Sequence, residues 1–348
     1  MEKIQKILTD KLLSSELIRY PVSLSHGKMG LSIYLYHLSK TESNSEYQSM
    51  AEQLLDRILL HDLSPNQSIA VEDGLAGVGL GMTYLIKNRF VEGDLNALLE
   101  GIDNEIFRRI AFHKDPSLFS ATQLLHLIGY LYIRLKEQTS KHLQTLYTDL
   151  IIKVLNMLYN QINDEFLSES YSFSIYHYQP PVLLWIFSKL LEVDFYNERI
   201  YRMLDELKLR ILSRFPLLHS NRLFLLWAML HLIPYLNDVA WSKYIQLLYR
   251  EINLEEILEN EMKNRKIFIS NGLSAVYILL HTINSSFPDY KIPFDPKMIY
   301  TKIQNSDAWN ALLERDYFLK IHQGLINGFP GVQLVLAHIK KYHDFDKI

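Results

Sequence analysis

The stretch Ser25-His26-Gly27-Lys28-Met29-Gly30-Leu31 contains the pattern that decides the fold: a polar segment, a glycine, two residues, a second small residue, and then an apolar helical run. Three later stretches follow the same pattern, namely Asp73-Gly74-Leu75-Ala76-Gly77-Val78, Asn271-Gly272-Leu273-Ser274-Ala275-Val276 and Asn327-Gly328-Phe329-Pro330-Gly331-Val332. Such a recurrence indicates an internal repeat.

The spacing of these glycines sets the length of the repeat. Gly27 and Gly74 are 47 residues apart, and Gly272 and Gly328 are 56 residues apart. The 198 residues between Gly74 and Gly272 leave room for about four steps. Weaker copies, each a polar or turn-like segment followed by an apolar helix, fill that interval at 119–131, 177–190 and 219–230. A period of about 50 residues is typical of two helices per repeat, an outer helix and then an inner helix that starts at the glycine.

The two small residues of the pattern, three positions apart, have a physical explanation. Glycine at a helix start permits unusual backbone angles, and a small residue three positions later lies on the same helical face. Inner helices that converge on a central axis need small residues there, so we expect these glycines to allow close packing between helices.

The rest of the chain also follows helical periodicity. Apolar residues recur at helical spacing, as in Leu143, Leu146, Leu150 and Val154, and alternating runs with Asn-Gly hairpin turns are missing. Most prolines fall between the apolar segments, where they end or start helices. The sequence therefore predicts an all-α protein, organised as a single domain over residues 1–348.

The composition excludes several classes of protein. A chain of 348 residues with 48% hydrophobic content and a net charge of −3 is expected to fold, and it shows no basic patch for a nucleic-acid partner. It has no cysteine, which excludes disulfides, thiolate metal ligands and a cysteine nucleophile. The most apolar stretch, 223–236, is too short to span a membrane, and residues 1–6 do not resemble a secretory signal. We expect a cytoplasmic protein with no membrane span.

Seven repeats of this kind resemble the LanC (lanthionine synthetase C) family, whose inner helices begin with such glycine motifs. The resemblance covers residues 25–338 and implies an α/α toroid of seven outer and seven inner helices. Cyclases of that family add a cysteine thiol to a dehydrated serine or threonine of a ribosomally made peptide, and zinc held by two cysteines and a histidine activates the thiol. The resemblance therefore implies a role in ribosomal peptide maturation, with a peptide substrate or a partner maturation enzyme as the bound molecule.

This sequence departs from the family at the zinc ligands. In the sixth repeat, Ser270 stands for a ligating cysteine and Asn271 for the histidine. In the fifth repeat, Leu218 or His219 takes the position of the other cysteine. Serine hydroxyl and asparagine amide are poor zinc ligands, so we expect no metal and no other cofactor. The aspartate that the family carries before its third glycine is also missing from residues 119–122.

Several titratable and aromatic residues lie where inner helices are expected to start. The resemblance implies a proton-transfer histidine in the fourth repeat, where His177 lies four residues before Pro181, as His26 lies four before Gly30. The candidate catalytic residues are His177, His26 and Asp73. Glu72 directly precedes Asp73, and His322 lies near the expected start of the last inner helix. Each of these has the alternative role of capping a helix or lying partly buried. The candidate substrate-binding residues are Tyr176, Tyr178, His219 and Asn271; the alternative for the tyrosines is packing between helix layers.

Three functional hypotheses follow. The first is a zinc-free, catalytically altered LanC-like protein that binds a peptide or serves as a scaffold for partner maturation enzymes. The second is an α/α-toroid enzyme whose carboxylates and histidines act on a peptide or a sugar. The third is a helical repeat platform for a protein partner, without a small-molecule site.

Overall fold

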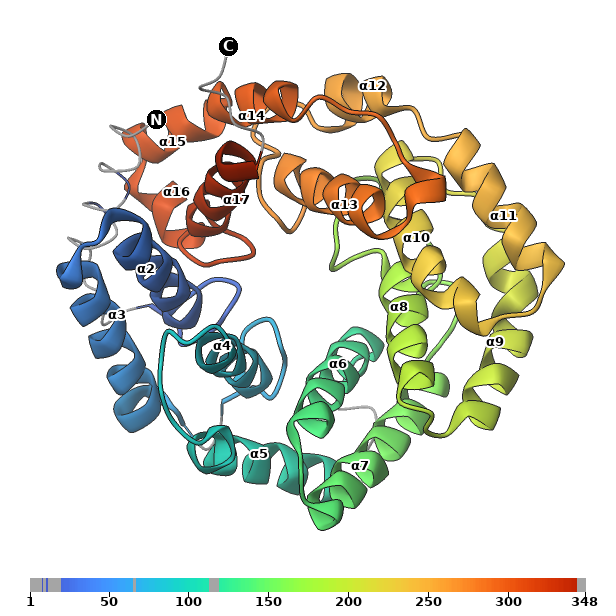
Figure 1. Ribbon diagram of the computed structural model, residues 1–348, viewed down its shortest axis with the longest axis horizontal. Helices are drawn as coiled ribbons and strands as arrows, with labels where there is room; N and C mark the ends of the chain where they lie inside the picture. Colours follow the sequence, from blue (N-terminus) through green and yellow to red (C-terminus); the bar gives the residue numbers. More distant parts are fainter. Residues whose placement is uncertain (1–7, 9–10, 12–19, 65–66, 113–118, 343–348) are drawn as a thin grey trace. The chain divides into compact units, whose positions relative to one another are not determined.

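The computed structural model describes residues 8, 11, 20–64, 67–112 and 119–342. These residues form helices joined by loops, and they contain no strand (Figure 1). The prediction of an all-α fold is confirmed. The chain divides into two compact units; the prediction of a single domain over 1–348 stays a prediction.

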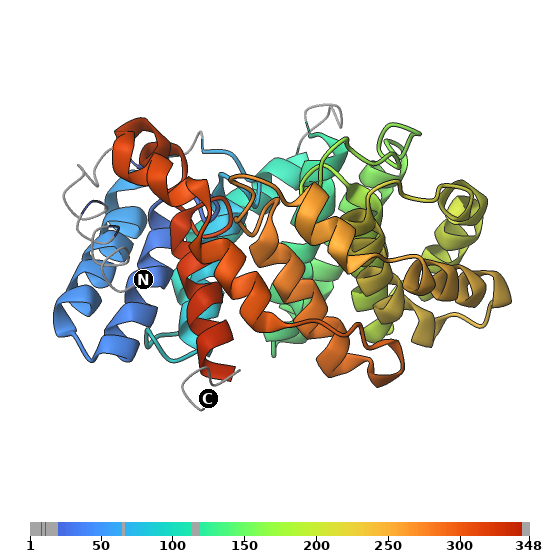
Figure 2. The same cartoon turned by 90° about the horizontal axis from the view of Figure 1, so that it is seen from above.

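The first unit comprises the described residues of Met1–His113, Asn264–Ile269 and Pro296–Ile348. Its helix α2 lies between α4 and α17, so that segments from both ends of the described chain meet within this unit. Figure 2 shows α2 and α3 side by side at the blue end of the chain. The helical elements of this unit are α2 (Lys28–Glu42), α3 (Ser45–Arg57), η2 (Ile58–Asp62), α4 (Leu75–Lys87), α5 (Leu95–Phe112), α14 (Pro296–Gln304), α15 (Asp307–Glu314), α16 (Asp316–Ile321) and α17 (Phe329–Tyr342).

The second unit comprises the described residues of Lys114–Lys263 and Ser270–Asp295. Within it α8 lies between α6 and α10, and α10 also contacts α13. Its helical elements are α6 (Ala121–Glu137), α7 (Lys141–Tyr159), α8 (Gln179–Glu192), α9 (Asn197–Leu212), α10 (His219–Leu232), η4 (Ile233–Tyr235), α11 (Val239–Arg250), α12 (Leu254–Glu256), η5 (Ile257–Glu261), α13 (Leu273–Ser286) and η6 (Pro288–Tyr290).

Two kinds of helix alternate along the chain. The helices α2, α4, α6, α8, α10, α13 and α17 each bury eight or more residues, and we call them the covered helices. The helices that follow them bury one stripe only; α9, for example, buries Ile200, Met203, Leu204, Leu207 and Ile211 and exposes charged residues elsewhere. A one-sided apolar stripe is what a helix needs to lie over a core, and we call a helix of this kind an outer helix.

The glycines fix a specific loop at the start of the covered helices. Gly27 precedes α2 with φ −140° and ψ −156°, and Gly74 precedes α4 with nearly the same angles, −132° and −160°. The residue after each glycine donates its N–H to a carbonyl seven residues earlier: Lys28 to Pro21 at 2.8 Å, and Leu75 to Ser68 at 2.8 Å. The chain therefore turns back and satisfies an N–H group at the start of the helix. We call each such segment a return loop.

The return loop explains why glycine is required. A Cβ atom at Gly27 would overlap the carbonyl oxygen of Pro21, and a Cβ at Gly74 would overlap that of Ser68. The angles of both glycines are extended, so the requirement is steric rather than conformational. From the sequence we expected the glycines to allow close packing between helices. The first glycine of each pair instead lies against a carbonyl of its own return loop.

Replacing Gly74 with alanine is expected to destabilise the protein by about 3 kcal/mol or more, because the added methyl group meets a fixed backbone carbonyl. Gly101 offers a matched control, since it lies inside α5 and a Cβ there would meet nothing within 4 Å. The Gly101→Ala variant should gain about 0.5–1 kcal/mol from helix propensity. Chemical denaturation measures both changes; equal effects of the two variants would contradict the steric argument.

Candidate functional site

A third return loop precedes α17, where Phe329 donates its N–H to the carbonyl of His322 at 2.9 Å, and the return loops of α2, α4 and α17 lie side by side in the first unit. Ser25 donates its N–H to the carbonyl of Glu72 at 3.3 Å, and Asn327 donates its N–H to the carbonyl of Ser25 at 3.2 Å. These backbone bonds link residues far apart in the sequence into one surface. Four predicted residues are thereby brought into one neighbourhood: His26, Glu72, Asp73 and His322.

His26 is held as a neutral imidazole. The amide Nδ2 of Asn327 lies 2.6 Å from its Nε2, and because an amide nitrogen only donates, Nε2 must accept and the ring proton sits on Nδ1. Burial lowers the pKa of His26 below its ordinary value, although the carboxylates of Glu72 and Asp73 act in the opposite direction. The side chain is half-buried, and the ring lies within the electrostatic reach of both carboxylates.

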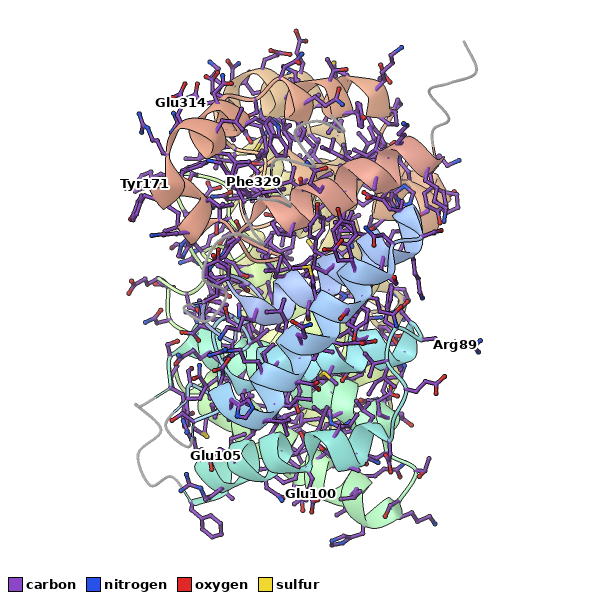
Figure 3. The ribbon with its side chains drawn as sticks, turned by 90° about the vertical axis from the view of Figure 1, so that its left-hand side faces the viewer. Arg89, Glu100, Glu105, Tyr171, Glu314 and Phe329 are labelled. Carbon is purple, nitrogen blue, oxygen red and sulfur yellow. The ribbon has the colours of Figure 1, made fainter. Side chains whose placement is uncertain are left out.

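His322 is enclosed by aromatic rings. It stacks on Phe268 with ring centroids 4.2 Å apart and an angle of 9°, and it meets Phe318 at 4.5 Å. Its Nδ1 lies 2.7 Å from the carbonyl of Asn327, to which it donates. Figure 3 shows Phe329, which packs against this cluster, at the start of α17. Burial lowers the pKa of His322, although the hydrogen bond to the carbonyl of Asn327 acts in the opposite direction; a positive charge on His26 would lower this pKa further.

The stability of the protein is expected to fall as the pH drops below 6.5, the ordinary pKa of histidine. A lowered folded-state pKa means that the unfolded chain binds protons first, so stability is complete above 6.5 and is lost as the pH falls through the lowered values. Urea unfolding at a series of pH values measures this. The double variant His26→Gln/His322→Gln should show a weaker dependence; an unchanged slope would show that these two rings do not contribute.

In the second unit, α10 begins without a return loop. The carboxylate of Glu261 takes the place of the loop: it accepts the N–H of His219 at 2.6 Å and the N–H of Ser220 at 2.9 Å, and it also accepts the Ser220 hydroxyl at 2.5 Å. A carboxylate is favourable there because the unpaired N–H groups give a helix start a partial positive charge.

A second carboxylate, that of Glu169, supports the same helix start. It accepts the N–H of Leu217 at 2.5 Å and the side-chain amide of Asn221 at 2.9 Å. The sequence analysis missed both glutamates. They lie more than 40 residues from their partners along the chain, so no local pattern signals the pairing.

His219 is part of this capping network. Its Nδ1 accepts the N–H of Asn253 at 3.1 Å and lies 2.9 Å from Nη1 of Arg222, which can only donate. The same guanidinium group also donates to the carbonyl of Glu251 at 2.9 Å. One ring nitrogen of His219 is therefore engaged in holding the start of α10.

Removing the charge of Glu261 by the Glu261→Gln substitution is expected to cost about 1–3 kcal/mol, because the amide leaves one of the three donors poorly satisfied and no longer opposes the helix dipole. Glu255 provides the control: it is exposed in the adjacent α12, and Glu255→Gln should change stability by less than about 0.5 kcal/mol. Thermal unfolding followed by circular dichroism compares the two variants. Equal midpoints would contradict the capping role.

The remaining predicted residues all lie in the second unit. His177 and Asn271 are exposed, Tyr176 is half-buried with its ring edge-on to His126 at 6.0 Å, and Tyr178 is only 4% exposed. Burial raises the pKa of Tyr178 well above its ordinary value. The catalytic candidates are thus divided between units, with His26 and Asp73 in the first and His177 in the second. Their roles in catalysis and binding stay predictions.

The loops before α8 and α13 are joined by a backbone bond. Ile175 donates its N–H to the carbonyl of Ser270 at 2.9 Å, which places the fourth-repeat loop beside the residue that stands for a family zinc ligand. Farther from this bond, Tyr171 is fully exposed (Figure 3). In the part of the chain that the structure describes, no group of three or more histidine, aspartate or glutamate side chains is arranged to hold a metal ion. None of the described helices is long and apolar enough to cross a membrane.

No family model matches this chain, and no curated protein matches its sequence. The resemblance to the LanC family rests on the repeat itself and stays a prediction.

Proposed function

We propose that this chain is a LanC-like protein of ribosomal peptide maturation that binds a peptide, or a partner maturation enzyme, without thiolate-bound zinc. In this proposal the seven covered helices form the inner ring of an α/α toroid. The observation that carries it is the repeated helix start: Gly272 precedes α13 with φ −148° and ψ −164°, matching Gly27 and Gly74 within about 20°. Phe329 likewise donates its N–H to the carbonyl of His322, seven residues earlier, at 2.9 Å.

The residues at the family zinc positions support a function without that metal. Ser270 is buried, and both serine hydroxyl and asparagine amide bind zinc poorly. His219, the one good ligand type, has a ring nitrogen engaged with Asn253 and Arg222. The chemistry that activates a thiol in cyclases therefore has no obvious support among these side chains.

A second candidate function is acid–base catalysis at the return loops of the first unit. His26 favours it, because a neutral imidazole with its proton on Nδ1 lies within the electrostatic reach of Glu72 and Asp73. The neutral ring would donate a hydrogen bond from Nδ1 and so position a peptide or a sugar, while one of the two carboxylates would act as the general base. This candidate requires that His26→Gln abolish turnover of a substrate while binding persists, whereas the binding function tolerates that change.

The zinc positions can be tested by restoring the ligands. Isothermal titration of the natural chain with zinc should show no stoichiometric binding below micromolar dissociation constants. The variant Leu218→Cys/Ser270→Cys/Asn271→His should bind zinc, and with Co²⁺ it should show the absorption bands of thiolate coordination. A control with Leu217→Cys in place of Leu218→Cys should bind more weakly. Tight zinc binding by the natural chain, or none by the restored variant, would contradict the proposal.

Peptide binding is tested by selection from a random-sequence peptide display library on the immobilised full chain. We expect enriched sequences that bind in solution and compete with one another for one site. If no sequence is enriched while a carbohydrate array gives specific binding, the second candidate function replaces the first.

A further inference from the structure

We draw no further inference here: the strongest candidate, the surface patch of the second unit where the stacked rings of Trp185 and Trp227 lie at accessible positions of the covered helices α8 and α10, is an unpartnered aromatic face, and nothing in the part of the chain that the structure describes shows what covers it.

Discussion

The structure depends on one steric constraint, the close approach of a loop carbonyl to the glycine that starts a covered helix. The N–H of Lys28 reaches the carbonyl of Pro21 only because Gly27 has no Cβ atom in the way. That bond satisfies an N–H group that a helix start would otherwise leave to solvent. Because the loop is fixed on its own helix, its outer edge can then pair with the next loop, as Ser25 does with Glu72.

The fifth repeat shows what is needed when this constraint is absent. There α10 starts without a glycine, and two carboxylates from distant segments, Glu169 and Glu261, satisfy its first N–H groups instead. A backbone loop is neutral, whereas these two like charges must be offset by the helix dipole and by hydrogen bonds. His219 and Arg222 belong to the same helix start, where Nη1 of Arg222 lies 2.9 Å from Nδ1 of His219.

The sequence predicted those parts of the arrangement that depend on residues close together in the chain. The all-α fold and the helix starts at Gly27, Gly74 and Gly272 follow from patterns of a few residues. The contact between His26 and Asn327 joins positions 301 residues apart, and no local pattern specifies such a partner. For the same reason, the two capping glutamates could not be predicted, whereas packing between helix layers was the alternative stated for Tyr178, which is buried.

The return loops are evidence for the fold but not for a chemical function. Their glycines are explained completely by sterics, so their presence says nothing about whether a thiol was ever activated nearby. Function must be argued from side chains that the fold does not need. Capping and packing account for the ring nitrogen of His219 and for the rings around His322. They do not account for the stacked rings of Trp185 and Trp227, which occupy accessible positions of two covered helices.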